Sequence, residues 1–353
     1  MARIVIELTN RCNLRCGHCF DERHAGTGDL PLGVIRKVLQ EGKSCGIDEL
    51  AFTGGEPTIH RQFDGIIREV CEAGYSFGFV SNGFNFSRIH SLLLRYRQWS
   101  KGATFSLDGA TEATHDRLRG KGSYRQVMRA ASICAFKDIP FTLNMVLTAQ
   151  NRQEVEEMVW LGGRLGSRAV RFGHLMATPE TAMRGLDLSP QERLEVEAEI
   201  WRLKESALIL VAMAPGYFSE SVFFPCAPLD LQELNLDCKA NVTLCCHLSG
   251  YPGPIDRADF IGNLSEIGLA EAVNRSRKMV TSYLMEKQAK VAGGEFSALD
   301  HFPCWYCLKY FDKASWLKNF PNHPWVASNE LWGKEVNGDN ARGEKALASP
   351  AGG

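Results

Sequence analysis

Cys12-Asn13-Leu14-Arg15-Cys16-Gly17-His18-Cys19 is the stretch that decides how this chain folds and what it binds. It places three cysteines at C-x3-C-x2-C spacing after a short apolar run, residues 4–8, which we predict to be a buried strand. Soft thiolates suit iron–sulfur clusters, and three thiolates from one loop can hold three irons of a [4Fe–4S] cube. The fourth iron then stays open to bind a substrate or cofactor.

Two other kinds of metal site also use closely spaced cysteines. Structural zinc sites pair C-x2-4-C spacings with a fourth ligand nearby, whereas the nearest further ligand here, His18, is wedged between Cys16 and Cys19. Simple ferredoxins supply four cysteines per cluster from tighter runs. The spacing therefore favours a cluster with three cysteine ligands.

Outward from this stretch, the first 175 residues alternate between strand and helix patterns. We predict strands at 4–8, 49–53, 77–80, 104–107, 141–146 and 169–172, and helices at 33–44, 61–72, 87–98, 123–136 and 152–165. Such alternation predicts a parallel sheet that right-handed crossovers can curl into a barrel. Active residues then belong at the C-terminal ends of the strands.

Polar motifs do follow three of these predicted strands. Thr53-Gly54-Gly55-Glu56-Pro57 follows the second strand, where two glycines let the backbone approach a ligand and Glu56 offers a carboxylate. Ser81-Asn82-Gly83 ends the third strand, and Ser106-Leu107-Asp108-Gly109 ends the fourth. Their short polar groups can bind a ribose or a carboxylate, although turn chemistry explains Asn-Gly and Asp-Gly equally well.

Together these residues resemble the radical SAM enzymes, whose signature is C-x3-C-x2-C after the first strand of a partial (β/α)6 barrel. The resemblance implies that Cys12, Cys16 and Cys19 ligate a [4Fe–4S] cluster whose open iron binds S-adenosylmethionine (SAM). Reductive cleavage of SAM would then give a 5′-deoxyadenosyl radical that abstracts a hydrogen atom. His18 stands where the family usually has an aromatic residue.

The resemblance also implies a set of contacts to SAM. These are Gly54, Gly55, Glu56, Ser81, Asn82, Ser106, Asp108, Arg119 and Asn144. The Arg119 guanidinium could fork onto the SAM carboxylate, and Arg117 is the competing candidate. Asparagine is uncommon within strands, so Asn144 is a further candidate for binding SAM. We expect His115 to be a packed or exposed residue at a helix start.

A second set of cysteines lies in the C-terminal half: Cys226, Cys238, Cys245, Cys246, Cys304 and Cys307. Four thiolates would close a second [4Fe–4S] site completely, and structural zinc is the main rival because C-x2-C pairs serve it equally well. The segment resembles the SPASM/twitch extension of radical SAM enzymes. This implies that an auxiliary cluster is held by Cys226, Cys245, Cys304 and Cys307.

Three details of this resemblance stay open. No cysteine follows Cys307, so the shorter twitch form with one auxiliary cluster matches better. Cys246 is the alternative to Cys245 as ligand, and Cys238 is expected to be a buried thiol. The hairpin glycine of the family is replaced around residues 240–241, where Asn241 tolerates left-handed backbone angles.

We therefore predict an α/β fold, a partial (β/α)6 TIM-like barrel followed by a small C-terminal twitch/SPASM-like iron–sulfur domain. Its limits are a barrel at 1–188, a bridging helix and strand at 189–222, an auxiliary-cluster domain at 223–320 and a disordered tail at 333–353. Ser189-Pro190-Gln191-Glu192 is the capping-box start of the bridging helix, which runs to about residue 206.

Composition narrows the partners and the compartment. The net charge of −1 argues against nucleic acid, and no apolar run is long enough to span a membrane. Without a signal-peptide pattern, the 12 cysteines are expected to bind metal in a reducing cytoplasm. An external electron donor such as flavodoxin or ferredoxin is expected.

The motifs described above are compatible with more than one class of substrate. We expect modification of a peptide or protein side chain, by a crosslink or an oxidation. Against it stands the expectation that no leader-binding domain precedes the first strand. The alternative is oxidation, decarboxylation or rearrangement of a small metabolite. A third possibility is a non-enzymatic iron–sulfur electron carrier. Such a carrier would have no use for the Gly-Gly-Glu-Pro motif at residues 54–57.

Overall fold

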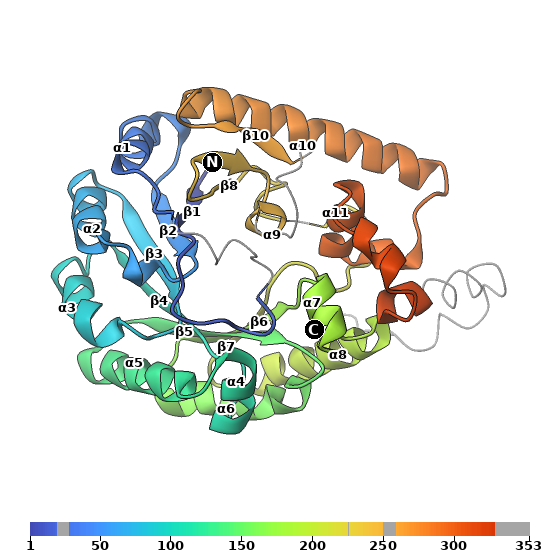
Figure 1. Cartoon of the computed structure of the whole chain (residues 1–353), viewed down its shortest axis with the longest axis horizontal. Helices are drawn as coiled ribbons and strands as arrows, with labels where there is room; N and C mark the ends of the chain where they lie inside the picture. The colour runs from blue at the N-terminus through green and yellow to red at the C-terminus, as the bar shows by residue number, and fades with distance from the viewer. Residues whose placement is uncertain (20–27, 225, 250–258, 329–353) are drawn as a thin grey trace, which may run out of the picture.

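The computed structural model describes residues 1–19, 28–224, 226–249 and 259–328, and its centre is one ten-stranded sheet (Figure 1). The strands are β1 (Arg3–Thr9), β2 (Glu49–Gly54), β3 (Ser76–Ser81), β4 (Ser100–Ser106), β5 (Phe141–Leu147), β6 (Ala169–His174), β7 (Leu210–Met213), β8 (Glu233–Leu236), β9 (Asn241–Thr243) and β10 (Phe260–Asn263). Their order across the sheet is β10-β9-β8-β1-β2-β3-β4-β5-β6-β7.

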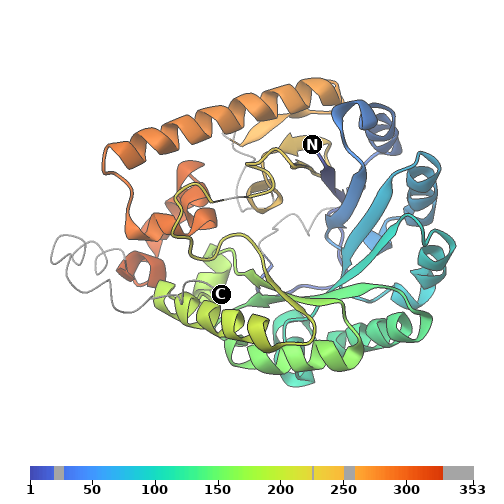
Figure 2. The same ribbon diagram turned by 180° about the vertical axis from the view of Figure 1, so that it is seen from behind.

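The helices lie mainly on the convex side of this sheet (Figures 1 and 2). They are α1 (Leu32–Glu41), α2 (Phe63–Glu72), α3 (Phe86–Arg95), α4 (Glu112–Arg119), α5 (Ser123–Lys137), α6 (Val155–Leu165), α7 (Pro179–Met183), α8 (Pro190–Ser206), α9 (Cys246–Ser249), α10 (Leu269–Ala292) and α11 (Pro303–Tyr310). Each of the first strands is followed by a helix that returns the chain, as the sequence pattern predicts.

Strands β1 to β7 are all parallel, which confirms the predicted α/β fold and the six predicted strands. The apolar run that we placed in the bridge becomes a seventh parallel strand, β7, paired with β6. The sheet curves around a concave inner face, as a partial barrel does (Figure 1).

The side-chain alternation of the strands decides which face is buried. In β5, Phe141, Leu143, Met145 and Leu147 are buried in the core, while the residues between them are half-buried on the concave side. The facing helices supply apolar stripes, such as Phe63, Ile66, Ile67 and Val70 of α2. Burying each such side chain stabilises the fold by about 1.5–3 kcal/mol.

The C-terminal segment extends the same sheet. Strand β8 pairs in parallel with β1, with Ile4 opposite Leu234, and β9 and β10 follow antiparallel. Lys37 of α1 donates to the carbonyls of Leu264 and Ile267 at 2.8 and 2.7 Å. The one sheet contains strands from the predicted barrel, the predicted bridge and the predicted C-terminal domain. The domain limits near residues 188 and 222 stay predictions. The predicted disordered tail at 333–353 lies outside the described residues.

The turn between β8 and β9 corrects one expectation. Ala240, and not Asn241, takes the left-handed backbone conformation, with φ of +66°. Asn241 instead begins β9 and donates from its backbone and its side chain to the Asp237 carboxylate at 2.9 Å. Pairing of β9 with β8 thus places the left-handed position one residue earlier. In the described parts of the chain, no helix is long and apolar enough to cross a membrane.

Candidate active site

The cysteine loop leaves β1 and is fastened to the strand beside it. Gly54 and Gly55 end β2 so close to this loop that a Cβ on Gly55 would lie 2.1 Å from the Arg11 carbonyl oxygen. The amides of Gly55 and Glu56 donate to the carbonyls of Thr9 and Arg11 at 2.8 and 2.9 Å. The two glycines therefore let the backbone approach the cysteine loop itself.

The sulfur atoms of the cysteine loop lie beside the Arg119 guanidinium and a backbone amide. The Arg119 Nη1 atom lies 3.9 Å from Cys16 Sγ, and the Leu14 amide donates to Cys12 Sγ at 3.4 Å. Burial raises the pKa of the Cys12 and Cys16 thiols, and the Arg119 charge works in the opposite direction. Soft thiols beside a fixed positive charge suit the anionic thiolates that an iron–sulfur cluster requires.

Glu56, which follows β2, accepts hydrogen bonds from residues at the end of β3. Its buried carboxylate accepts from Thr58 Oγ1 at 2.6 Å, from Ser81 Oγ at 2.9 Å and from the Asn82 amide at 2.7 Å. Asn82 in turn donates to the Asn13 side chain of the cysteine loop at 2.8 Å. Glu56 thus connects the ends of β2 and β3 to the cysteine loop, while its contact with SAM stays a prediction.

Asp108 is the buried charge at the centre of the site. Its carboxylate pairs with Arg119, lies 3.1 Å from His18 Nε2 and accepts from the Val146 amide at 2.8 Å. Burial alone would raise the pKa of Asp108, but the Arg119 guanidinium and the His18 imidazole hold it well below its usual range. His18, which departs from the family pattern, thereby ties the cysteine loop to β4.

The structure also separates the two competing arginines. Arg119 is held between Asp108 and Cys16, and both negative groups raise its pKa although burial would lower it. Arg117 is exposed on the other side of α4 and donates to the Gln150 carbonyl at 3.1 Å. Only Arg119 therefore reaches the cysteine loop.

Residues on the concave face continue this polar row. Ser106, Asn144 and Arg171 are in register on β4, β5 and β6. Arg171 was not predicted from the sequence, since an arginine within a strand pattern gives no sign of which face it occupies. Arg171 is exposed and makes no hydrogen bond or ion pair to the described residues. Ser106 and Asn144 remain candidate SAM contacts.

The second cysteine set comes together from distant segments. Cys304 and Cys245 are half-buried. Desolvation, followed by the nearby Cys307 and Cys226 sulfurs, raises the pKa of the Cys304 thiol. A hydrogen bond with Cys246 works against the rise in the pKa of Cys245 that desolvation, Cys226 and Cys304 cause. Tyr283 of α10 forms a hydrogen bond with Cys307 at 3.3 Å between Oη and Sγ. The four predicted thiols therefore form one half-buried set that fits a second cluster.

Two further cysteines were left open by the sequence. The thiols of Cys245 and Cys246 share a hydrogen bond, so both stand at the same site and the choice of ligand between them stays open. Cys238 is buried in the β8–β9 turn, with 4% of its surface exposed, as expected of a thiol that packs as a small apolar group. All 12 cysteines are free of disulfide bonds.

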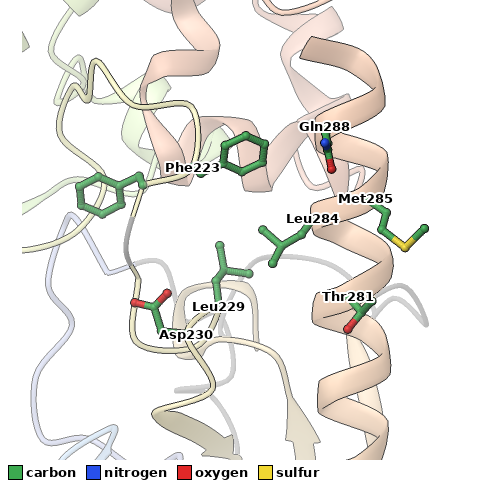
Figure 3. Close-up of a pocket in the computed structure, with 8 residues that line it drawn as sticks. Phe223, Leu229, Asp230, Thr281, Leu284, Met285 and Gln288 are labelled. Atoms are coloured by element: carbon green, nitrogen blue, oxygen red, sulfur yellow. The ribbon is translucent and has the colours of Figure 1, made fainter. Parts of the chain in front are cut away.

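An apolar pocket lies apart from these sets, between α10 and the segment before β8 (Figure 3). Its volume is about 380 Å³, and it is lined by Phe223, Phe224, Leu229, Asp230, Thr281, Leu284, Met285 and Gln288. None of these lining residues was predicted as a site residue, and we assign the pocket no part in the chemistry.

Comparisons with known proteins agree with this arrangement. The radical SAM superfamily matches residues 6–161. The chain is 29% identical to an AdoMet-dependent heme synthase from Methanosarcina barkeri over 223 residues, covering 61% of this chain and 62% of that protein. It is 25% identical to the mycofactocin maturase MftC from Mycobacterium tuberculosis, covering 68% of this chain and 60% of that protein. The chain thus spans about three fifths of the length of these relatives.

Solved structures share the fold. Streptococcus suis SuiB bound to its precursor peptide SuiA superposes with a TM-score of 0.61 at 15% identity, covering 77% of this chain and 64% of SuiB. The structure of anSMEcpe with bound AdoMet gives a TM-score of 0.61 at 16% identity, covering 79% of this chain and 82% of that one. Residues 6–161, with the cysteine loop at the end of β1 and the parallel strands that follow, form a radical SAM domain.

Proposed function

We propose that this protein is a radical SAM enzyme that modifies a peptide or protein side chain, by a crosslink or an oxidation. The observation that carries the proposal is the cysteine loop held against Arg119, Asp108 and the glycine pair that ends β2. The peptide substrate is supported by relatives named as peptide-modifying proteins, among them MftC, the sporulation killing factor maturation protein SkfB from Bacillus subtilis and the PqqA peptide cyclase.

In this proposal the residues of the loop hold the cofactor and orient it. Cys12, Cys16 and Cys19 hold three irons, and Arg119 balances part of the thiolate charge. A cluster held there would supply the electron that cleaves bound SAM. Ser106 and Asn144, side by side on the concave face, offer polar groups to SAM.

The second cysteine set is proposed to hold an auxiliary cluster. This proposal is supported by two observations: the thiols of the four cysteines Cys226, Cys245, Cys304 and Cys307 lie near one another and are half-buried, and Tyr283 forms a hydrogen bond with Cys307. Such a cluster would take the electron that an oxidised product must lose. A flavodoxin or ferredoxin as external donor and a cytoplasmic setting complete the proposal, the latter supported by 12 cysteines without a disulfide.

A small metabolite is the second candidate substrate. The observation that favours it is the likeness to AdoMet-dependent heme synthases, one from Methanosarcina barkeri and one from Oleidesulfovibrio alaskensis at 26% identity. To separate the two, we would incubate the enzyme with SAM, dithionite and any short peptide encoded beside its gene. A peptide that loses two hydrogen atoms supports the first candidate, and an unchanged peptide supports the second.

Iron and SAM-cleavage assays test the proposed activity itself. After anaerobic reconstitution, the zinc-free protein should hold about eight irons per chain, from two [4Fe–4S] clusters. Cys16→Ala should abolish formation of 5′-deoxyadenosine and retain the second cluster, because Cys16 is one of only three ligands to the SAM-binding cluster. Continued 5′-deoxyadenosine formation by this variant under dithionite would refute the assignment.

A further inference from the structure

Arg171 lies on the concave face of the sheet, inside the partial barrel. Its neighbours along β6, Val170 and Phe172, belong to the hydrophobic core. Because side chains alternate along a strand, Arg171 faces the opposite, concave side. It is in register with Asn144 of β5, which is in register with Ser106 of β4. The three side chains therefore form one row across the inner face of neighbouring strands (Figure 1).

The guanidinium of Arg171 is a cation that the described parts of the chain leave without a partner. It makes no hydrogen bond or ion pair to any of these residues, and its side chain is exposed. By contrast, Arg3 of β1 pairs with Glu233, and Arg119 beside the cysteine loop pairs with Asp108. A free guanidinium can bind a carboxylate through two parallel N–H bonds, a geometry that suits this planar anion. Arg171 is therefore available to an anionic ligand.

The surroundings of Arg171 place it on the side of the second cysteine set. Burial, and next the charge of Arg171, lowers the pKa of His247 on α9 to about 4. Glu233 of β8 and the Cys246 thiol also lie close enough to Arg171 to interact with it electrostatically. The thiols of the cysteine loop instead interact with Arg119. Arg171 therefore lies apart from the proposed SAM carboxylate partner, toward the second set.

Small side chains on the same face leave room beside this arginine. Gly173 lies two residues further along β6, and Ala212 of β7 is in register with Arg171. Ala51 of β2 and Gly78 of β3 are paired on the same inner face. Val80 of β3, which also faces inward, is 39% exposed, so solvent reaches this face of the sheet. A substrate side chain can therefore enter alongside the guanidinium.

We propose that Arg171 binds a carboxylate of the substrate peptide, either an acidic side chain or the C-terminal carboxylate. This inference rests on the proposed function, because it takes the concave face as the place where the peptide lies. The row from Arg171 through Asn144 to Ser106 leads toward Asp108, which lies beside the cysteine loop. A carboxylate held at Arg171 would thus direct the adjoining part of the peptide toward the proposed site of radical formation.

Equilibrium binding of two pairs of model compounds tests this anchor without turnover. The first pair is N-acetyl-glutamic acid α-amide and its neutral isostere N-acetyl-glutamine amide, and the second is N-acetyl-diglycine and its amide. Ligand-observed NMR measures each on the anaerobically reconstituted full chain, with and without SAM. The wild type should bind the acid of one pair about 10- to 100-fold more tightly than its amide, as expected of hydrogen bonds to a charged group.

Variants of the arginine assign this preference. Arg171→Gln should abolish it, whereas Arg171→Lys should keep part of it because lysine keeps the charge and loses the planar fork. Arg117→Gln, exposed on α4, is the matched control and should keep the full preference. A preference within the first pair identifies an acidic side chain as the anchored group, and a preference within the second identifies the C-terminal carboxylate.

Three outcomes would overturn the proposal. Equal binding of acid and amide in both pairs by the wild type would remove the anchor. A preference that persists in Arg171→Gln would assign the carboxylate to another residue, and one that is lost when SAM is added would assign Arg171 to SAM. Circular dichroism establishes that each variant folds. Because no turnover is needed, a failure to form 5′-deoxyadenosine would refute the proposed function and leave this binding result as it is.

Discussion

At the scale of single residues, Asp108 holds the site together by serving five partners. Its carboxylate meets Arg119, His18 and the Val146 amide, its own amide donates to His115 Nδ1 at 3.0 Å, and its carbonyl accepts from the Asn151 side chain. Removing one partner of a buried ion pair costs about 3–5 kcal/mol because the other charge is left uncompensated. The family motif names Asp108, but only its partners explain why a carboxylate is needed there.

His115 should make the protein sensitive to mild acid. Burial lowers the pKa of His115 to about 4 from an ordinary value of 6.5, so the folded protein keeps this ring neutral. Between pH 6.5 and about 4 the unfolded chain binds a proton that the folded protein does not, and the free energy of unfolding falls as the pH is lowered. The full effect is at most about 3 kcal/mol.

Replacing this histidine by a residue that does not titrate isolates its contribution. His115→Asn keeps an acceptor near the position of Nδ1, so its free energy of unfolding should fall less steeply than that of the wild type between pH 6.5 and 4.5. Urea unfolding under anaerobic conditions measures the difference, and His90→Asn, half-buried on α3, serves as the control. Equal slopes for His115→Asn and wild type would show that folding does not shift the pKa of His115.

At the scale of elements, capping residues and buried helix faces determine where the helices around the site begin and what they contact. The capping box predicted from Ser189 and Glu192 is present, with the Glu192 amide donating to Ser189 Oγ at 3.2 Å and the Ser189 amide donating back at 2.8 Å. Helix α10 is the long element that spans the C-terminal segment, and its buried face brings Tyr283 and Lys287 to the second cysteine set. Helix α10 therefore sets the electrostatic surroundings of that site.

The hydrogen bond from α10 should raise the reduction potential of an auxiliary cluster. Tyr283→Phe removes the hydroxyl that bonds Cys307 Sγ and keeps the ring, so the reduced, more negative state loses stabilisation. A hydrogen bond of about 1 kcal/mol corresponds to a fall of roughly 40 mV for a one-electron couple. Redox titration followed by electron paramagnetic resonance measures it. Tyr310→Phe, whose ring packs on Tyr283, is the control and should leave the potential unchanged.

At the scale of the whole molecule, one sheet connects the two cysteine sets. Strand β1 leads into the cysteine loop and is also the neighbour of β8, which precedes Cys245, while β6 ends at His174 beside Cys304. The C-terminal segment is thus built onto both sides of the barrel opening (Figures 1 and 2). This arrangement places the two cysteine sets within one continuous structure.

Loss of the second set should separate SAM cleavage from product formation. Cys304→Ala should leave Cys12, Cys16 and Cys19 intact and still yield 5′-deoxyadenosine, but fail to finish an oxidised product. The reason is that hydrogen abstraction leaves a substrate radical, which must lose one more electron to an acceptor. The test is a paired assay of 5′-deoxyadenosine and product in variant and wild type. Equal product yields, with the auxiliary cluster absent from the variant, would rule out any role for the second set.

The sequence by itself determined the features that depend on neighbouring residues. The C-x3-C-x2-C spacing, the alternation of strand and helix patterns and the polar motifs at strand ends all depend on short-range periodicity and residue chemistry. These features sufficed to predict the parallel α/β fold and the cysteine loop at the end of β1, both of which the structure and the family match confirm.

Only the tertiary structure decided which residues that are far apart in the sequence lie close together. Arg117 and Arg119 are equivalent in the sequence, and the packing of α4 turns Arg119 alone toward Cys16. The pairing of β8 with β1 joins segments far apart in the chain, which no local pattern reports. Arg171 and Cys246 come from two such segments, because convergence of this kind is fixed by the path of the whole chain.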